Sequence, residues 1–407
     1  MSDCCSQPGL LPVATAREKL LNALQPVSDE ECVDTAMAAG RIVAKPVTST
    51  LDLPPCDNSA MDGYAIRFAD LQSGKPLEVI GRAFAGTPFT GSVNPGTCVR
   101  IMTGAVLPDG ADTVVMQEQA EAEGGFIRVS GRVSVGDHIR QRGEDIRDGD
   151  ALLAPGTRIT VAHIALMAAA GVHTVTVKRR PKVALFSTGD ELRQPGTPLR
   201  AGDIYDSNRP ALRAALSEMH LEVLDLGTLP DSRAAIAEAL QRAAREADAI
   251  ISSGGVSVGE ADYTREVLEE QGEISFWKVA MKPGKPFAFG RLGNTPFFGL
   301  PGNPVSALVT FYQLVVPALT HIQGKTWTAP PTLQAKLQQP LKKKPGRTDF
   351  QRGIFQNDAA NGLVVDPVGL QGSHILSGLA AANCFIVLPQ DSGPAQPGDL
   401  VTIEPLR

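Results

Sequence analysis

The stretch ISSGGVSVGEADY, residues 251–263, decides how the centre of this chain folds. A short apolar run leads into a glycine-rich loop, and Gly254 and Gly259 stand at the spacing of the two glycines in a P-loop. A P-loop continues with Lys and then Ser or Thr, whereas Glu260 and Ala261 follow here, with Asp262 next. The pattern predicts a strand, an anion-binding loop and a helix, without the usual lysine to offset the charge of the anion.

Strands and helices alternate on both sides of this stretch. Short buried strands are indicated by KVALFS, LEVLDLG, DAIISS and PFFGL, and amphipathic helices by PALRAALSEM, SRAAIAEALQRAAREA and TREVLEEQG. The last strand runs into PGNPVSALVTFYQLV, where Asn303 is the expected N-cap and Pro304 the first helical residue. This alternation predicts an α/β domain with a parallel or mixed sheet covered by helices on both faces.

The segments outside this domain divide into helical and β-like parts. VATAREKLLNAL has an apolar stripe at helical spacing, and a second helix is expected from Glu30 to Ala39, ending at Gly40. Thr160 is expected to cap a further helix, VAHIALMAAA. Short alternating strands rich in Gly and Pro predict an inserted and a C-terminal β domain. The expected domains are an N-terminal helix packing with the α/β domain (1–26), a split helical linker domain (27–45 and 147–180), the inserted β domain (46–146), the α/β domain (181–328) and the C-terminal β domain (329–407).

The composition argues against several classes of function. The chain has 407 residues and a formal net charge of −6, so it has no general attraction for nucleic acid or an anionic membrane. Its six cysteines form no C-x-x-C pair, which argues against a zinc cluster and for reduced thiols. No signal-peptide pattern is present, and no apolar run approaches the ~18 residues of a membrane span. A cytoplasmic protein that binds neither nucleic acid nor membrane is expected.

Acidic residues follow the same strand ends as the glycines. Ligands bind outside the carboxyl ends of the strands in an open α/β sheet, and Glu191, Asp231, Glu260 and Asp262 lie at or near such ends. Carboxylates repel a phosphate unless a cation stands between them, and Mg²⁺ takes one or two carboxylates plus phosphate oxygens. A magnesium site is therefore predicted. The simpler alternatives stay open: that the glycines only form tight turns, and that Asp262 only caps the following helix.

Positive charge gathers in one short run, KVAMKPGKP, residues 278–286. Lys282 and Lys285 flank a Pro-Gly turn, which can hold two ammonium groups around a small oxyanion. A second basic run, residues 342–347, is more typical of a solvated turn. The inserted β domain has polar clusters of its own, which salt bridges between domains would also explain. No Ser-His-Asp hydrolase elbow and no G-x-G-x-x-G fingerprint is present.

Seven motifs in order carry a resemblance: DNSAMDGYA, RIMTGA, RQRGEDI, FSTGDEL, SSGGVSVGEADY, KPGKPFAFG and GLPGNPVSALVTF. Together they resemble the molybdopterin molybdenumtransferase (MoeA) family, whose eukaryotic relatives are of the gephyrin E-domain type. The resemblance runs from about Ala14 to the C-terminus. It implies a four-domain homodimer that joins molybdate to adenylylated molybdopterin, releasing AMP and forming molybdenum cofactor with Mg²⁺. It also implies an active site shared between two subunits.

The resemblance also assigns residues by motif. The catalytic set that it implies is Asp62, Thr103, Asp145, Glu191, Asp231 and Asp262, of which Glu191, Asp231 and Asp262 are the expected metal ligands. The molybdate pocket that it implies comprises Lys282, Lys285, Pro286, Ser306, Arg352 and Ser373, with Lys278 beside it. The remaining expected substrate contacts are Gly254, Gly255, Ser257, Gly259, Pro301, Pro304 and Arg140.

Three other functions remain as alternatives. A molybdopterin adenylyltransferase would share the α/β domain and its glycine loop but would need neither β domain. A gephyrin-like scaffold without catalysis would not need the acid and lysine motifs, which are intact here. A nucleotide-processing hydrolase with the same α/β domain is the third. If the family resemblance holds, the expected partners are a second copy of the chain, a molybdopterin adenylyltransferase and maturation proteins of molybdoenzymes.

Overall fold

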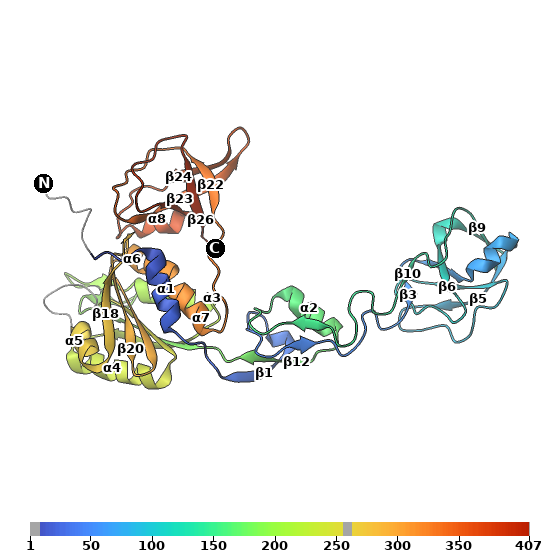
Figure 1. Cartoon of the computed structure of the whole chain (residues 1–407), viewed down its shortest axis with the longest axis horizontal. Helices are drawn as coiled ribbons and strands as arrows, with labels where there is room; N and C mark the ends of the chain where they lie inside the picture. The colour runs from blue at the N-terminus through green and yellow to red at the C-terminus, as the bar shows by residue number, and fades with distance from the viewer. Residues whose placement is uncertain (1–8, 255–262, 407) are drawn as a thin grey trace. The chain divides into compact units, whose positions relative to one another are not determined.

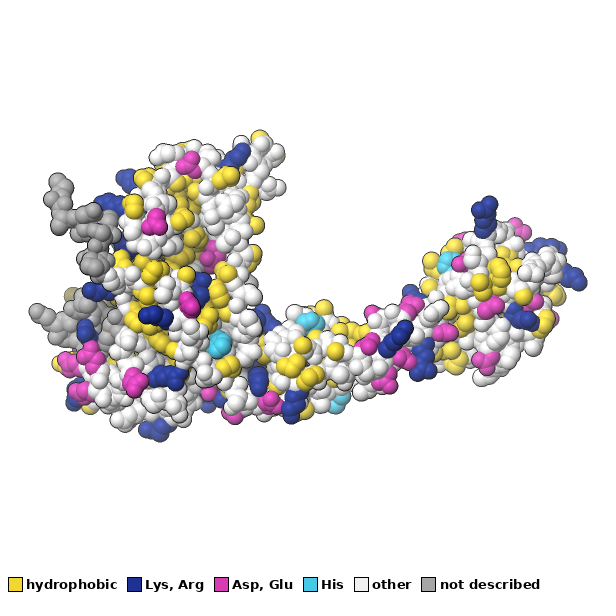
Figure 2. Space-filling view, in the orientation of Figure 1, with side chains coloured by type: hydrophobic (Ala, Val, Ile, Leu, Met, Phe, Trp, Pro, Cys, Tyr) yellow, Lys and Arg dark blue, Asp and Glu magenta, His cyan; other side chains and the backbone are white. Residues whose placement is uncertain are grey.

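A computed structural model describes residues 9–254 and 263–406 of the chain. The chain divides into two compact units, which are described separately (Figure 1). The larger unit comprises the chain up to Glu31 and from Lys178 onward, and the smaller unit comprises Cys32–Val177. On the face drawn in Figure 2, basic and acidic side chains are interspersed over both units.

The larger unit is built on the predicted α/β sheet, which is mixed. Its strand order is β16-β13-β17-β21-β20-β18. The first four strands are parallel, whereas β20 is antiparallel to β21 and β18 is antiparallel to β20. The bounds are β16 Glu222–Leu229, β13 Lys182–Thr188, β17 Ala249–Ser253, β21 Thr295–Leu300, β20 Pro286–Leu292 and β18 Glu273–Lys278. The expected fold class is thus confirmed for this part of the chain.

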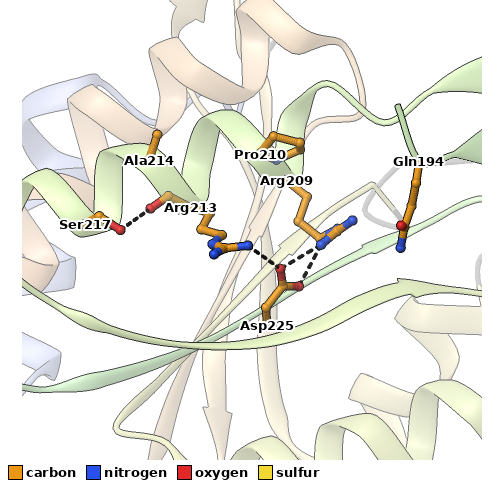
Figure 3. Close-up of a pocket in the computed structure, with 7 residues that line it drawn as sticks. All are labelled: Gln194, Arg209, Pro210, Arg213, Ala214, Ser217 and Asp225. Carbon is orange, nitrogen blue, oxygen red and sulfur yellow. Dashed lines mark hydrogen bonds and ion pairs between the residues drawn. The ribbon is translucent and has the colours of Figure 1, made fainter. Parts of the chain in front are cut away.

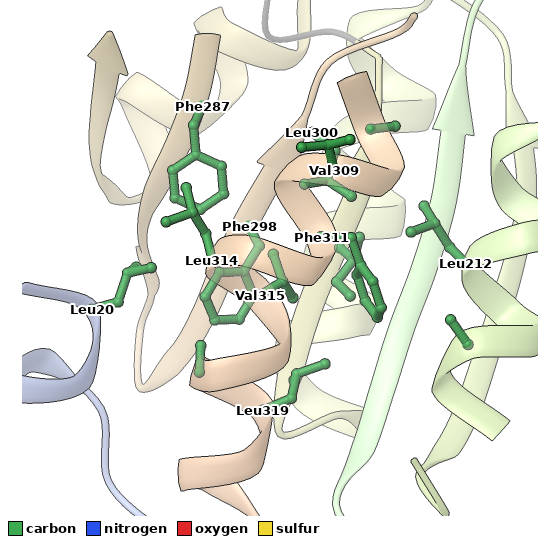
Figure 4. Close-up of a cluster of buried hydrophobic side chains, with 14 of the residues drawn as sticks. Leu20, Leu212, Phe287, Phe298, Leu300, Val309, Phe311, Leu314, Val315 and Leu319 are labelled. Carbon is green, nitrogen blue, oxygen red and sulfur yellow. The ribbon is translucent and has the colours of Figure 1, made fainter. Parts of the chain in front are cut away.

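Helices cover both faces of this sheet, each over its own apolar core. One core joins Leu20 and Leu212 to Phe298 and Leu314 (Figure 4). The other packs Ile236 and Leu240 against the opposite face. Helices α1 (Val13–Ala23), α3 (Asn208–Glu218), α6 (Pro304–Thr310) and α7 (Val316–Ile322) lie on the first face, and α4 (Arg233–Glu246) and α5 (Tyr263–Gln271) on the second.

Helices α6 and α7 form one continuous helical segment with a π-helical turn, Phe311–Val315, between them. Pro317 has no N–H, so it cannot donate to the carbonyl of Gln313 four residues earlier. The Arg17 guanidinium of α1 donates to that carbonyl from Nε and Nη2, at 3.3 and 3.2 Å. The segment Pro304–Ile322 is long and apolar enough to cross a membrane, but 78% of it is buried inside the unit. It serves here as the core helix of the sheet.

The C-terminal part of the larger unit is a small β barrel. The extra pairing of β23 with β25 closes the order β23-β24-β22-β26-β25 on itself, and β19 joins its rim beside β23. The register places Lys282 of β19 opposite Asp349 of β23. The bounds are β19 Met281–Lys282, β22 Leu333–Leu337, β23 Thr348–Asp358, β24 Gly362–Pro367, α8 Leu376–Ala381, β25 Cys384–Leu388 and β26 Leu400–Pro405; the short pair β14 Leu192–Arg193 and β15 Ile204–Tyr205 also belongs to this unit.

The smaller unit contains a six-stranded sheet of order β7-β4-β6-β5-β9-β8, as the alternating sequence predicts. Thr160 caps α2 as expected, because its hydroxyl accepts a hydrogen bond from the N–H of His163. The sheet strands are β4 Gly63–Ile66, β5 Leu77–Ala83, β6 Thr97–Ile101, β7 Thr113–Met116, β8 Ala120–Glu123 and β9 Phe126–Val129. Other elements of this unit include β2 Val47–Thr48, β3 Asn58–Ser59, β10 Ile139–Arg140, β11 Ala151–Leu153, α2 Val161–Ala169 and two 3-10 helices, Phe68–Ser73 and Gln117–Gln119.

The prediction of a helix from Glu30 to Ala39 was wrong. The structure has strand β1, Glu30–Asp34, followed by a single 3-10 turn, Thr35–Met37. Strand β1 pairs with β12, Thr174–Lys178. Cys32, Val33 and Thr35 have weak helix propensity, so pairing with a distant strand outweighs the helical pattern of the alanines.

Candidate active site

The carboxyl ends of the four parallel strands lie in register at one edge of the sheet. Thr188 pairs with Leu229 across β13 and β16. Ser253 of β17 pairs with Ser187 on one side and with Leu300 on the other. The loops that the sequence singled out all leave from this edge, so the predicted placement of the strand ends is confirmed.

Three carboxylates gather in the loops after β13 and β16. The N–H of Asp231 donates to Asp190 Oδ1 at 3.0 Å. Burial raises the pKa of Asp231, and the negative charges of Asp190 and Glu191 add to this effect. Glu191 folds back over the preceding turn, where a Cβ on Gly189 would lie 2.7 Å from its Oε2. Asp190 was not singled out from the sequence, although it stands beside Glu191 in the same strand-end motif.

Gly254 begins the glycine-rich loop. Its φ is +91°, and a Cβ there would lie 2.9 Å from the carbonyl oxygen of Thr188. Its N–H donates to the carbonyl of Leu300 at 3.1 Å. A side chain at this position would separate neighbouring strand ends, so the structure requires glycine. Of the other residues predicted for this loop, Gly255, Ser257, Gly259 and Asp262 lie outside the described residues.

A buried asparagine of α3 connects the ends of two neighbouring strands. Asn208, the first residue of α3, donates from Nδ2 to Ser253 Oγ and to the carbonyl of Gly302, both at 2.8 Å. Among the described residues, its Oδ1 and the hydroxyls of Ser187 and Ser252 have no hydrogen-bond partner. Buried polar atoms without partners are unusual. Ser187 shares the Asn208 face of the sheet, whereas Ser252, next to Ser253 along β17, faces the other side. Nothing in the sequence around Asn208 signalled its role.

The loop after β21 leads into α6 and meets the C-terminal barrel. Asn303 is the N-cap and Pro304 the first helical residue, as predicted. The N–H of Val305 donates to the carbonyl of Ser373 at 3.1 Å. Pro301 and Ser306 are buried beside this contact. The structure therefore brings the predicted residues Pro304, Ser306 and Ser373 to one place.

The predicted basic turn is compact. Lys278 pairs with Pro286 across β18 and β20, and the N–H of Val279 donates to the carbonyl of Lys285 at 2.8 Å. Gly284 has a φ of +105°, and a Cβ there would lie 2.4 Å from Thr310 Oγ1 of α6. The turn is thus held against the helix that carries Ser306. Lys282 Nζ lies 3.3 Å from Asp349 Oδ2 of the barrel.

The Arg352 guanidinium lies among backbone carbonyls of the C-terminal part of the chain. The side chain is fully buried, and its Nη atoms donate to the carbonyls of Gln371, Leu370 and Gly372 at 3.2, 2.9 and 3.1 Å. Burial lowers the pKa of Arg352. Its Nε has no partner among the described residues. Arg352 thus holds the loop that leads into Ser373, and the predicted oxyanion contact stays a prediction.

The smaller unit carries the remaining predicted residues. Asp62 Oδ1 accepts two hydrogen bonds from Thr103, from the backbone N–H at 2.7 Å and from the hydroxyl at 2.8 Å. These bonds hold the pKa of Asp62 below its ordinary value. Arg140 pairs with Asn58 across β10 and β3, and the N–H of Asp145 donates to the carbonyl of Leu53 at 3.1 Å. All four predicted side chains are exposed.

The acids fit a magnesium ion in their chemistry but do not form a complete cage. Within residues 9–254 and 263–406, no three His, Cys, Asp or Glu side chains form a ready metal site. Mg²⁺ usually takes only one or two carboxylates and completes its shell with water and phosphate oxygens. Glu191 and Asp231, with Asp190, offer such hard oxygen donors at the strand ends. The third predicted ligand, Asp262, is outside the described residues.

A separate surface pocket of about 550 Å³ lies between α3 and β16 (Figure 3). Arg209 and Arg213 of α3 both reach Asp225 of β16, at 2.7 and 3.8 Å. Arg209 also binds the buried Asp206. Both guanidinium groups are therefore paired within the protein, and none of the predicted site residues lines this pocket.

Comparison with known proteins adds three matching regions in order along the chain. They are the MoeA N-terminal region (domain I and II) over residues 11–171, a domain described as "Probable molybdopterin binding domain" over 184–321, and the MoeA C-terminal region (domain IV) over 334–406. The chain is 48% identical to the molybdopterin molybdenumtransferase of Haemophilus influenzae, over 98% of this chain and 99% of that protein. Gephyrin of Dictyostelium discoideum is 32% identical over 97% of this chain and 62% of its own length.

A solved structure gives the same result at the level of the fold. The molybdopterin biosynthesis MoeA protein from Pyrococcus horikoshii OT3 superposes with a TM-score of 0.84 at 31% identity, covering 98% of this chain and 100% of that one. The similarity in sequence and fold thus extends over nearly the whole length of the chain, which belongs to the MoeA family of molybdopterin molybdenumtransferases.

Proposed function

We propose that this chain inserts molybdate into adenylylated molybdopterin, releasing AMP and forming molybdenum cofactor. One observation carries the proposal. Helix α6 connects an acid-bearing edge of strand ends, where a phosphorylated substrate would bind, to a basic turn suited to a small oxyanion. Helix α6 begins at Pro304, shortly after β21 ends at that edge, and Gly284 packs on Thr310 at the other end of the helix. An adenylyltransferase or a scaffold would not need both features.

The proposed reaction balances without an oxidant. Water hydrolyses the bond between the AMP phosphate and the pterin phosphate. The two thiol groups of the pterin replace two oxygens of molybdate, which leave as two water molecules. The thiols supply two of the four protons and solvent supplies the other two, so molybdenum keeps its oxidation state. The protein forms no covalent bond, so its contribution is to position the reactants and to offset charge.

The chain's own residues divide this work. Gly254 brings the backbone close to the phosphates, and Asn208 fixes the strand ends around it. Lys282 and Lys285 hold molybdate, and Arg352 keeps the Ser373 loop in place beside them. In this division Arg352 acts through the loop and not directly on molybdate.

We further propose that Mg²⁺ binds beside the phosphates through Glu191 and Asp231, with Asp190 next to them and Asp262 as the third ligand expected from the motif. When bound, the ion would neutralise phosphate charge. The raised pKa of Asp231 supports this proposal, because neighbouring carboxylates that repel one another gain from a shared cation.

We also propose that the chain acts as a cytoplasmic homodimer in which Asp62, Thr103, Arg140 and Asp145 complete the site of the partner subunit. The support is chemical: these residues form an exposed polar group in a small β unit with no cofactor chemistry of its own. The expected neighbours in the pathway are a molybdopterin adenylyltransferase before this step and molybdoenzyme maturation proteins after it.

The test is AMP release from adenylylated molybdopterin by the purified chain, with and without molybdate, and with and without excess chelator. Release that needs both molybdate and a divalent cation supports the proposal. Full release without molybdate would show that the chain only hydrolyses the adenylylated pterin.

A further inference from the structure

A buried ion pair lies directly beneath the basic turn. The side chains of Asp349 and Lys343, both in the C-terminal barrel, are only 2% and 0% exposed, and their Oδ1 and Nζ atoms are 4.0 Å apart. Charged side chains are rarely buried this deeply unless their partners are fixed. The second basic run, predicted to be a solvated turn, therefore contains one lysine that is not solvated.

Three backbone carbonyls accept hydrogen bonds from the Lys343 side chain. Its Nζ donates to the carbonyls of Lys344, Arg347 and Gln390, at 3.0, 2.6 and 3.3 Å. Three acceptors match the three N–H bonds of an ammonium group. Burial lowers the pKa of Lys343, and the Asp349 carboxylate opposes that shift.

The other oxygen of Asp349 faces the basic turn. Asp349 Oδ2 lies 3.3 Å from Lys282 Nζ and 3.5 Å from Gln351 Nε2, which also donates to the carbonyl of Lys342 at 3.1 Å. The Lys282 side chain is 50% exposed, so it is open to solvent on one side. Parallel pairing of β19 with β23 sets the backbone of Lys282 opposite Asp349. The carboxylate fixes the end of a long side chain whose backbone is already fixed.

Asp349 does not neutralise the positive charge of Lys282, because Lys343 already balances the charge of Asp349. Asp349 contributes one negative charge and Lys343 one positive charge, so the buried pair is neutral. Lys282 keeps its own positive charge for a ligand on its solvent side. A carboxylate without Lys343 would neutralise Lys282 as well as orient it.

We propose that Asp349, with its charge balanced by Lys343, is a positioning residue that aims Lys282 at the oxyanion substrate. This role rests on the proposed function, in which Lys282 binds molybdate. Lys285 and Ser306 then meet the anion from the turn and from α6, while Asp349 acts only through Lys282.

The direction in which Asp349→Asn changes molybdate affinity distinguishes a positioning role from a purely electrostatic effect. Asp349→Asn removes a negative charge from beside the anion, so Coulomb attraction alone would tighten molybdate binding. Loss of the anchor instead frees Lys282 and weakens binding, on the order of tenfold for one charged hydrogen bond. Molybdate alone, titrated into the full chain by calorimetry, measures the difference. Tighter or unchanged binding overturns the role.

A double-mutant cycle shows whether Asp349 acts through Lys282. In a Lys282→Ala background, Asp349→Asn should no longer weaken molybdate binding, since only the loss of the nearby negative charge remains. A purely structural role would weaken binding in both backgrounds. Asp358→Asn, in a turn at the far end of the same strand, is the matched control and should leave the Kd unchanged, since its carboxylate only accepts from Ala360 and Asn361.

A charge-matched variant provides a second test in case Asp349→Asn, which leaves Lys343 unpaired, does not fold. Asp349→Asn combined with Lys343→Gln removes both buried charges together, which is generally tolerated better than leaving one unpaired. It preserves the net charge but has no anchor for Lys282, so molybdate binding should again weaken by about tenfold. Wild-type affinity in this variant overturns the positioning role.

The two proposals fail in different ways. A wild-type chain that binds molybdate but releases no AMP overturns the proposed reaction. The positioning of Lys282 by Asp349 can then still be tested by calorimetry. A wild-type chain that releases AMP, but whose molybdate affinity is insensitive to Asp349→Asn, overturns only the positioning role. A chain that binds no molybdate overturns both.

Discussion

Asp231 is a strand-end acid whose charge is disfavoured in the folded protein. Its pKa is raised by burial and by the charges of Asp190 and Glu191. The folded-state pKa therefore lies above the unfolded value, and ionisation of Asp231 destabilises the fold once the pH exceeds that range. A destabilising acid kept at a strand end is typical of a binding site, where stability is given up for function.

We expect Asp231→Asn to raise the free energy of unfolding at pH 7. The gain should disappear below about pH 4, because the wild-type carboxyl is then protonated in both the folded and the unfolded state. Urea unfolding at the two pH values measures this directly. A variant that is less stable at pH 7 would mean that the carboxylate makes favourable contacts within the protein.

Lys285 and Arg352 should behave differently although both were predicted to bind the oxyanion. Lys285→Ala should raise the molybdate concentration needed for AMP release about tenfold, the effect of one charged hydrogen bond, with no large change in melting temperature. Arg352→Ala should also lower the melting temperature, because the carbonyls of residues 370–372 each lose a donor, with only that of Gly372 keeping another, the N–H of Ile375. Equal melting temperatures for the two variants would contradict the loop-holding role of Arg352.

Among the elements, the helical segment Pro304–Ile322 depends most clearly on a partner far away in sequence. Pro317 leaves the carbonyl of Gln313 without its helical donor, and Arg17 of α1 supplies the replacement. Arg17 also lies 4.4 Å from the ring centroid of Trp327. Helix α1 is thereby fastened to the core helix by a polar contact as well as by Leu20.

Arg17→Met should therefore destabilise the chain by about 1–3 kcal/mol, since it leaves a buried carbonyl unpaired while keeping much of the side-chain volume. Chemical denaturation measures the difference. The control is Arg233→Met on α4, where an exposed ion pair with Glu270 is lost and a change of at most about 1 kcal/mol is expected. Similar losses in both variants would argue against a special role for Arg17.

The same elements show what sequence patterns can and cannot predict. Local signals were sufficient where a buried strand or a capped helix is defined by its own residues, as for β13 and for α2 with Thr160. They failed for Glu30–Ala39, where pairing with β12 outweighs helix-like spacing. The strand-end acids and the basic turn were predicted from their positions. Asn208, Lys343 and Asp349 were not, because their roles arise from contacts with residues far away in sequence.

For the whole molecule, the predicted acids are divided between the two units of the chain. Asp62, Thr103 and Asp145 belong to the smaller unit, and Glu191 and Asp231 to the larger one. If the active site is shared between subunits, each half comes from a different copy. In a twofold dimer the two composite sites are then equivalent.

Mixing inactive subunits tests this arrangement. Asp145→Ala and Glu191→Ala should each be inactive as homodimers, whereas a heterodimer pairs one doubly damaged site with one intact site. With random equal mixing about half of the dimers are mixed, so roughly a quarter of wild-type activity should return. Demonstrated subunit exchange without recovery would place both residues in the site of a single chain.

The molybdate dependence of AMP release tests the central claim most directly. Purified chain is incubated with adenylylated molybdopterin and Mg²⁺, and AMP is measured as molybdate is raised from zero to saturation. The account predicts that AMP appears only with molybdate, in step with molybdenum bound to the pterin, and that Lys285→Ala shifts the curve to higher molybdate. Molybdate-independent release of AMP at the full rate, or molybdenum insertion without AMP, would contradict it.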